Sequence, residues 1–212
     1  DVYSQHTYSI PQIYDTDATL ETVRQDGHSI IFVHQGKLSV TSDATVGAIY
    51  VGPTAELEVG INAKLTVDSL MLRTTPWEAA VLTNDGTIQA GKTYYTRIIS
   101  DNSQYYQFAL PLAVEVEKVH LSNYMPMGYG VTWVLKQYSE YYRATEGAGG
   151  ANEWQVLTDF KTITPYAGYE MFSNTGNFYC EYYFPVILPS SEATTVPVSY
   201  TGNGAAGAAH SG

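Results

Sequence analysis

Cysteine, basic residues and long apolar runs are all scarce in this sequence. Its single cysteine, Cys180, leaves no partner for an internal disulfide bond, so a hydrophobic core must stabilise the chain. The 10 Lys and Arg residues stand against 21 Asp and Glu, a formal net charge of −11. This balance disfavours nucleic acids and anionic lipid surfaces, because phosphate recognition depends on clustered cations. No apolar run approaches the ~18 residues that a membrane span requires.

The chain also lacks several localisation signals. Its first residues, DVYSQHTYSI, contain neither the basic nor the apolar region of a signal peptide, so we expect a cytosolic protein or one whose signal has been removed. No Asn-x-Ser/Thr sequon occurs, which gives no support to a eukaryotic glycoprotein. Charged residues make up only 15% of the sequence, so uncharged polar residues and Tyr must cover the surface, as is common outside cells. Without disulfide bonds, any secretion would be of the bacterial kind.

Short strands with alternating apolar residues dominate residues 27–91. Pairs of apolar residues separated by one residue recur there, and turn residues such as Gly, Asp, Asn and Pro fall between them. The pairs are Ile31 and Val33, Leu38 and Val40, Ile49 and Val51, Leu57 and Val59, Leu65 and Val67, and Leu70 and Leu72. No helical periodicity of comparable length competes. We therefore predict half-buried strands of about four or five residues.

Two architectures accommodate such strands: a sandwich of hairpins, and a β-solenoid in which each coil stacks on the last. The solenoid is favoured because the Leu-x-Val units resemble one another more than hairpin partners usually do. Two-residue hairpin turns are also rare. Each apolar pair is too small to stand alone, and stacking it on similar neighbours would bury a continuous core. The sandwich remains open for this segment.

Aromatic residues become dense after Gly91, which marks the predicted boundary between two domains. Runs such as TYYTRIIS, QYYQFALP, GVTWVLKQYS and NFYCEYYFPV combine aromatic and β-branched side chains, as strands do. We predict an aromatic-rich antiparallel β-sandwich over residues 92–190, after an extended segment at 1–26 and the solenoid-like repeat at 27–91. A Gly/Ala/Ser tail at 191–212 completes a chain whose fold class is all-β.

The motifs follow one another in a characteristic order. SLMLRT precedes YYTRIISDNSQYYQFALPLAV, then YSEYYRA with a glycine-rich loop and a tryptophan, and finally ITPYAGYEM and YYFPV. This order resembles a module of large secreted surface proteins of Bacteroidetes, in which an aromatic part follows a stack of Leu/Val repeats. The resemblance covers about residues 27–212. It implies an extracellular location on the bacterial outer surface, as a fragment of a longer chain, and it carries over no catalytic residues.

Residues suited to metal or phosphate binding are sparse. Asp15 and Asp17 are two residues apart, so both carboxylates could bind one calcium ion. The remaining ligands and the glycine of a calcium-binding loop are missing, and a solvated turn is therefore favoured. The five histidines are scattered without zinc-site spacing, and Cys180 is expected to be a buried thiol. The glycines of EGAGGANE lack the lysine of a phosphate-binding loop. No cofactor is therefore predicted.

Glycoside hydrolysis would need two carboxylates that face one sugar across about 5–10 Å. The spacing of the acidic residues in the aromatic segment selects no such pair among Glu140, Glu146, Glu153, Asp159, Glu170 and Glu181. Glu140 and Arg143 are better explained as a charged strand edge, which discourages unwanted pairing. A hydrolase is therefore a minor alternative.

Tyrosine is the feature that asks for a functional explanation. The chain has 19 Tyr and 6 Phe, and rings that carry hydroxyls suit half-buried positions and recognition surfaces, where sugar rings stack on them. Adjacent residues such as Tyr141 and Tyr142 are expected on opposite sides of a strand, so at most half can share one face. The rings expected to be exposed and to bind ligand lie beside loops: Tyr129, Tyr142, Trp154 and Tyr166. Packing between sheets is the alternative explanation.

The sequence thus predicts a non-catalytic cell-surface binding or adhesion module, which recognises a glycan or another surface protein through exposed aromatic residues. One alternative is a purely structural spacer within a long surface chain. The other is a polysaccharide hydrolase that uses two carboxylates. No nucleic-acid partner and no membrane insertion are expected, and the oligomeric state is open.

Overall fold

The computed structural model divides the chain into two compact units. The solenoid unit comprises residues 1–100, 118–125 and 179–192, and the aromatic unit comprises residues 101–117, 126–178 and 193–212. The structure describes residues 11–20, 28–99, 105–121, 129–130, 133–147, 152–157, 162–174 and 180–188. The tail predicted at 191–212 lies outside the described residues.

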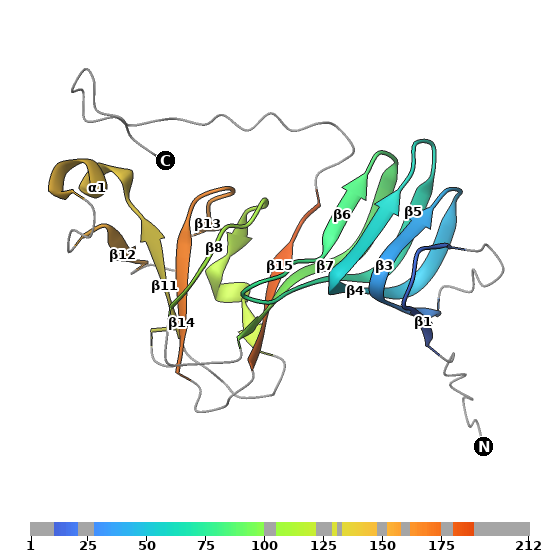
Figure 1. The fold of residues 1–212 in the computed structure, drawn as a ribbon, viewed down its shortest axis with the longest axis horizontal. Helices are drawn as coiled ribbons and strands as arrows, with labels where there is room; N and C mark the ends of the chain where they lie inside the picture. Colours follow the sequence, from blue (N-terminus) through green and yellow to red (C-terminus); the bar gives the residue numbers. More distant parts are fainter. Residues whose placement is uncertain are drawn as a thin grey trace. The chain divides into compact units, whose positions relative to one another are not determined.

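Parallel pairing organises the solenoid unit (Figure 1). Its parallel strands are β1 (Gln12–Tyr14), β2 (Ala18–Thr19), β3 (Ile30–Val40), β4 (Ala44–Val59), β5 (Lys64–Thr74), β6 (Val81–Asn84) and β7 (Thr87–Ile99). Both β1 and β2 pair with β3, and both β5 and β6 pair with β4, because each coil has more than one side. The segment predicted as an extended lead-in therefore supplies part of the first coil.

The register stacks like residues on like residues. Ile31 lies beside Ile49, and Ile49 beside Leu70, while Leu38 lies beside Leu57. Each coil takes about 20 residues, and these side chains are fully or almost fully buried in one hydrophobic core. The prediction of a solenoid-like stack is confirmed, because each coil completes the core of its neighbour.

The strands are longer than the predicted four or five residues. β4 runs over 16 residues, because the backbone keeps its inter-strand hydrogen bonds around the corners of the coil. A register shift between Val33 and Gln35 marks one corner. Gly52 lies opposite it, where a Cβ atom would approach the carbonyl oxygen of His34 at 2.8 Å. Glycine there allows the close approach that the turn requires.

Antiparallel strands extend the stack beyond β7. β15 (Cys180–Val186) pairs with β7, and β10 (His120–Leu121) pairs with β15. The boundary predicted after Gly91 falls inside β7. A Cβ atom on Gly91 would lie 2.9 Å from the carbonyl oxygen of Asp68, so this glycine serves a tight corner of the coil.

A partly buried ion pair joins the parallel and antiparallel parts of this sheet. Arg73 Nε donates to Glu181 Oε1 at 3.0 Å, and Arg73 Nη2 donates to Glu181 Oε2 at 3.2 Å. The Thr96 hydroxyl donates to Glu181 Oε1 at 2.6 Å. Glu181 is buried, and these donors satisfy its carboxylate.

The aromatic unit contains separate antiparallel sheets. The larger sheet has the order β12 (Trp154–Val156), β11 (Trp133–Tyr138), β14 (Tyr169–Ser173) and β8 (Tyr105–Phe108). A second sheet pairs β9 (Val114–Glu115) with β13 (Thr162–Ile163), and the short 3-10 helix η2 (Val116–Lys118) follows β9. The all-β prediction of a solenoid-like stack followed by antiparallel aromatic strands is confirmed.

The segment YSEYYRA is helical from Glu140 onward, so the prediction of a strand there is wrong. α1 (Glu140–Glu146) begins after Ser139, whose hydroxyl accepts a hydrogen bond from Tyr142 N, and ends before Gly147 at φ 85°. Glu140 in the first turn favours a helix start, and local capping outweighs the β propensity of the aromatic residues. Tyr141 and Tyr142 consequently do not alternate across a strand, and Glu140 and Arg143 form no strand edge. No helix in the described ranges is long and apolar enough to cross a lipid bilayer.

Candidate functional site

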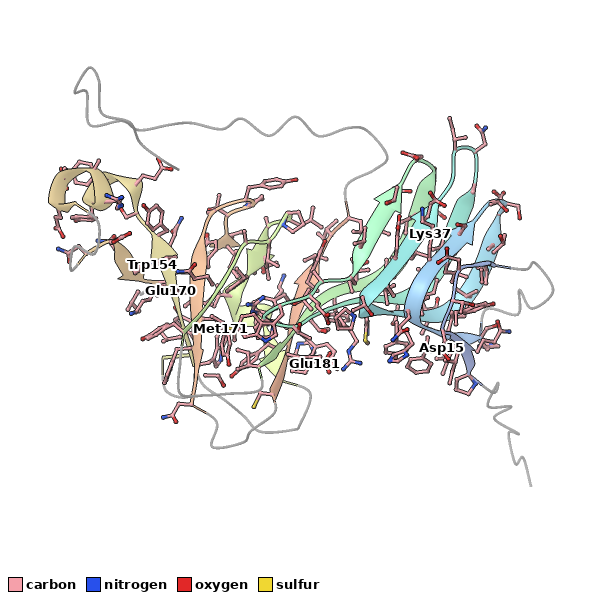
Figure 2. All side chains as sticks on the ribbon, viewed as in Figure 1. Asp15, Lys37, Trp154, Glu170, Met171 and Glu181 are labelled. Carbon is pink, nitrogen blue, oxygen red and sulfur yellow. The ribbon has the colours of Figure 1, made fainter. Side chains whose placement is uncertain are left out.

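One face of the β12-β11-β14-β8 sheet is partly open to solvent, and the other is buried. Trp133, Leu135, Tyr169 and Met171 point to the buried face, as the period of two along each strand requires. The open side, which we call the polar-aromatic face, consists of Tyr105, Gln107, Val134, Lys136, Tyr138, Trp154, Val156, Glu170 and Phe172. Figure 2 labels Trp154 and Glu170 on this sheet.

A row of polar side chains crosses the middle of the polar-aromatic face. Lys136 pairs with Glu170 across β11 and β14, and Glu170 pairs with Gln107 across β14 and β8. Gln107 Nε2 donates to Glu170 Oε1 at 3.4 Å. The ammonium of Lys136 lies 3.9 Å from the centre of the Tyr105 ring, a cation–π contact. The row thus offers an ammonium, an amide and a carboxylate side by side.

Two aromatic pairs flank this polar row. Tyr138 and Trp154 meet edge to face, with ring centroids 5.2 Å apart and an interplanar angle of 61°. Tyr105 and Phe172, at the other end, lie 5.1 Å apart at 37°. At 3.2–3.4 Å per strand residue, the pairs stand roughly 13 Å apart along the strands. The face therefore presents one aromatic pair on β12 and β11, then polar groups, then a second aromatic pair on β14 and β8, diagonally across the sheet.

Of the four predicted ligand-binding rings, Trp154 lies on the polar-aromatic face and Tyr129 does not. Tyr129 is half buried, and its hydroxyl donates to the Leu157 carbonyl at 2.6 Å and accepts from Leu135 N at 3.4 Å. Burial raises the pKa of this hydroxyl, although the backbone contact with Leu135 opposes the rise. Its ring packs edge to face on Trp133. Tyr129 therefore ties β11 to the segment after β12.

Tyr142 and Tyr166 also lie away from the polar-aromatic face. Tyr142 is half buried on α1, where its ring meets the more exposed Tyr141 at 5.3 Å. Tyr166 occupies a turn with φ 61°, its side chain is 53% exposed, and its N–H donates to the Leu110 carbonyl at 2.7 Å. The four predicted rings therefore form no common site. Sequence reasoning missed the cross-strand partners of Trp154, because strand register decides them.

The acidic residues of the aromatic segment have diverse surroundings. Glu153 lies 3.8 Å from Arg143, and Glu146 accepts hydrogen bonds from Asn152. Glu181 belongs to the solenoid unit and pairs with Arg73. Asp159 lies outside the described residues. The polar-aromatic face as defined carries one carboxylate, that of Glu170.

The candidate calcium ligands serve the corners of the solenoid. Asp15 lies 3.0 Å from His34 Nδ1, and Asp17 Oδ1 accepts a hydrogen bond from Lys37 N at 2.9 Å. Figure 2 labels Asp15 and Lys37. Asp43 accepts from Lys64 N in the same way at 3.0 Å, at a different corner of the coil. Within the described ranges, no three His, Cys, Asp or Glu side chains group as a metal site would require. The Asp-x-Asp pattern is thus explained by turn formation.

A second aromatic surface, unexpected from the sequence reading, runs across the outside of the solenoid. We call it the aromatic ladder: Phe32, Tyr50, Met71, Tyr94, Tyr183 and His120. The sequence does contain a signal for this ladder in the middle residue of each three-residue unit. That residue is apolar or aromatic in IFV, IYV and LML, and it is polar or charged in LSV, LEV and LTV. Only the first kind of unit lies on this side of the coil.

The rings of the aromatic ladder mainly contact one another. Phe32 and Tyr50 stack with centroids 4.7 Å apart and planes at 15°, and His120 stacks on Tyr183 at 5.2 Å. Tyr94 meets Tyr183 edge-on. Burial raises the pKa of Tyr183, and the negative charge of Glu181 adds to the rise. Ring faces used in this way are less available to a ligand, so the ladder mainly stabilises the stack.

No family model, curated protein or solved structure matches this chain. The function is therefore inferred from geometry. Of the two aromatic surfaces, the polar-aromatic face combines rings with hydrogen-bonding groups, and it is the stronger candidate for a binding site.

Proposed function

We propose that the protein is a non-catalytic module that binds a linear glycan on the polar-aromatic face. The observation that carries this proposal is the row formed by Lys136, Glu170 and Gln107 between two aromatic pairs. The bacterial cell-surface location implied by the sequence resemblance is part of the same proposal.

The chemistry of sugars supports this choice. A pyranose ring has an apolar face of C–H groups, which stacks on an aromatic ring, and a rim of hydroxyls, which pair with amides and charged groups. A chain of a few sugars lying obliquely across the strands would meet Trp154 and Tyr138 on β12 and β11, then the polar row, then Phe172 on β14. The formal net charge of −11 favours neutral glycans over polyanions.

Binding is favoured over hydrolysis because the polar-aromatic face offers one carboxylate, Glu170. Both common routes of glycoside hydrolysis use two acidic groups on either side of the bond. The spacer alternative accounts for the solenoid unit, but it gives no reason for half-exposed rings beside a polar row.

The test is an array of host and plant glycans with mucin, followed by titration calorimetry on each glycan that binds. We expect saturable binding that weakens at least about tenfold in Trp154→Ala, because an aromatic ring that stacks on a ligand carries a large share of the affinity. Runs with and without calcium should agree. Gln107→Ala should weaken binding less.

Tyr141→Ala is the matched control, because Tyr141 is 62% exposed and lies off the face. Its affinity should equal that of the unchanged protein. Silence across the array from folded protein would refute the proposal and favour the spacer, and release of reducing sugar would favour the hydrolase.

A further inference from the structure

One corner of the solenoid carries an insertion that the equivalent corners lack. Val33 leads to Leu38 and Val51 leads to Leu57 in adjacent coils, whereas the next coil runs from Leu72 to Leu82. The extra residues fall between β5 and β6, within 75–80. Insertions in single repeats of a solenoid often form its binding surface, because they leave the stacked core unchanged.

The insertion is a tightly hydrogen-bonded turn. The Thr75 hydroxyl accepts hydrogen bonds from Trp77 N at 3.2 Å and Glu78 N at 3.0 Å. Thr75 N donates to the Glu78 carbonyl at 2.7 Å, and Ala80 N donates to the Arg73 carbonyl at 2.9 Å. Pro76 fixes one further dihedral angle. The backbone of Trp77 is therefore held before any ligand arrives.

The side chain at the tip of this turn is a large apolar ring in solvent. Trp77 is 84% exposed, compared with 42% for Tyr105, the most exposed ring of the polar-aromatic face. An indole held out by a rigid turn loses little conformational entropy when a partner covers it. Glu78 beside it is exposed too and offers a carboxylate to hydroxyl donors.

We propose that Trp77 is a second glycan contact, specific for the flat surface of an insoluble polysaccharide. A protruding ring cannot surround a single sugar chain, whereas it can lie against many chains packed side by side. The polar-aromatic face is an open sheet that can lie along one chain. This inference rests on the proposed glycan-binding function and adds the physical form of the ligand.

The experiment compares one polysaccharide in two forms, for example insoluble cellulose or chitin and the matching soluble oligosaccharide. Depletion isotherms measure the first, and titration calorimetry measures the second. Trp77→Ala should weaken binding to the insoluble polymer about threefold to tenfold and leave the oligosaccharide affinity unchanged. Trp154→Ala should weaken both. Ile61→Ala, at another exposed turn of the same unit, should change neither.

Unchanged polymer binding by Trp77→Ala would overturn this inference while the proposed function stands. The inference would also be overturned, with the proposed function intact, if the unchanged protein bound the oligosaccharide but not the insoluble polymer. Self-association in sedimentation velocity that Trp77→Ala abolishes would overturn it as well, because a second copy would then occupy the tip. Absence of binding to both forms of every polysaccharide in the series, together with silence across the glycan array, would refute the proposed function itself, and the Trp77 inference with it.

Discussion

The solenoid unit and the aromatic unit use the same residue types in opposite ways. In the solenoid, aromatic residues on adjacent coils stack on one another, as Phe32 and Tyr50 do at 4.7 Å. In the aromatic unit, Tyr138 and Trp154 meet edge to face beside charged and amide groups. Repetition aligns identical side chains and favours stability, whereas irregular antiparallel pairing brings unlike side chains together and favours recognition.

The largest expected effect is the loss of the repeated core. Leu65→Asp removes a fully buried leucine stacked between Ala44 and Ile88 and places a carboxylate among apolar side chains. The cost is on the order of 5 kcal/mol or more, which is comparable to the total stability of many domains. Circular dichroism and chemical denaturation should show an unfolded solenoid unit.

Thr66→Asp is the control, because Thr66 is the next residue and points outward. It should fold and unfold at nearly the original denaturant concentration. Equal damage by both variants would mean that stacking of the inner side chains does not hold the coils together.

The ion pairs Arg73–Glu181 in the solenoid unit and Arg143–Glu153 in the aromatic unit offer a second contrast. The Glu181 side chain is 10% exposed and pairs with Arg73 at 3.0 Å, whereas the Arg143 side chain is 39% exposed and lies 3.8 Å from Glu153. Arg73→Ala leaves a buried carboxylate with fewer donors, so we expect a loss of about 2–3 kcal/mol, reduced from the fully buried case because Arg73 itself reaches solvent. Arg143→Ala should cost less than about 1 kcal/mol.

Hydrogen exchange with mass spectrometry separates these effects, because it reports on β7 and β15 independently of α1. Arg73→Ala should speed exchange in the two solenoid strands alone. Similar losses for both arginine variants would show that burial does not distinguish the pairs.

Particular residues show how far the sequence predicts these features. Leu38 and Leu57 can be aligned by eye because parallel stacking repeats a local pattern. Trp154 and Tyr138 cannot be paired in this way, since antiparallel register depends on contacts between distant segments. The helix at YSEYYRA had a local signal in Ser139 and Gly147, but the aromatic content concealed it. The insertion at Trp77 becomes visible only once the coils are aligned.

A double dissociation tests the different roles of the two aromatic surfaces. Tyr50→Ala removes a stacked ring from the aromatic ladder and should lower stability by about 1 kcal/mol while glycan affinity stays constant. Trp154→Ala should weaken glycan binding and change stability by a similar or smaller amount. Glycan binding that depends on Tyr50 and not on Trp154 would transfer the site to the solenoid unit.

The smallest effect concerns pH and the causes of two tyrosine shifts. The folded pKa of both Tyr129 and Tyr183 is raised, chiefly by burial. The folded state therefore holds these protons above the unfolded pKa of about 10, so stability is retained below that pH and falls as pH rises beyond it.

For Tyr183 the charge of Glu181 contributes too. Glu181→Gln should lower the pKa of Tyr183 and leave the pKa of Tyr129 unchanged. Spectrophotometric titration measures both values, and the variants Tyr129→Phe and Tyr183→Phe assign each transition to its residue. A shift of both would mean that the substitution loosens packing generally, whereas a shift of Tyr183 alone would locate the charge effect in the solenoid unit.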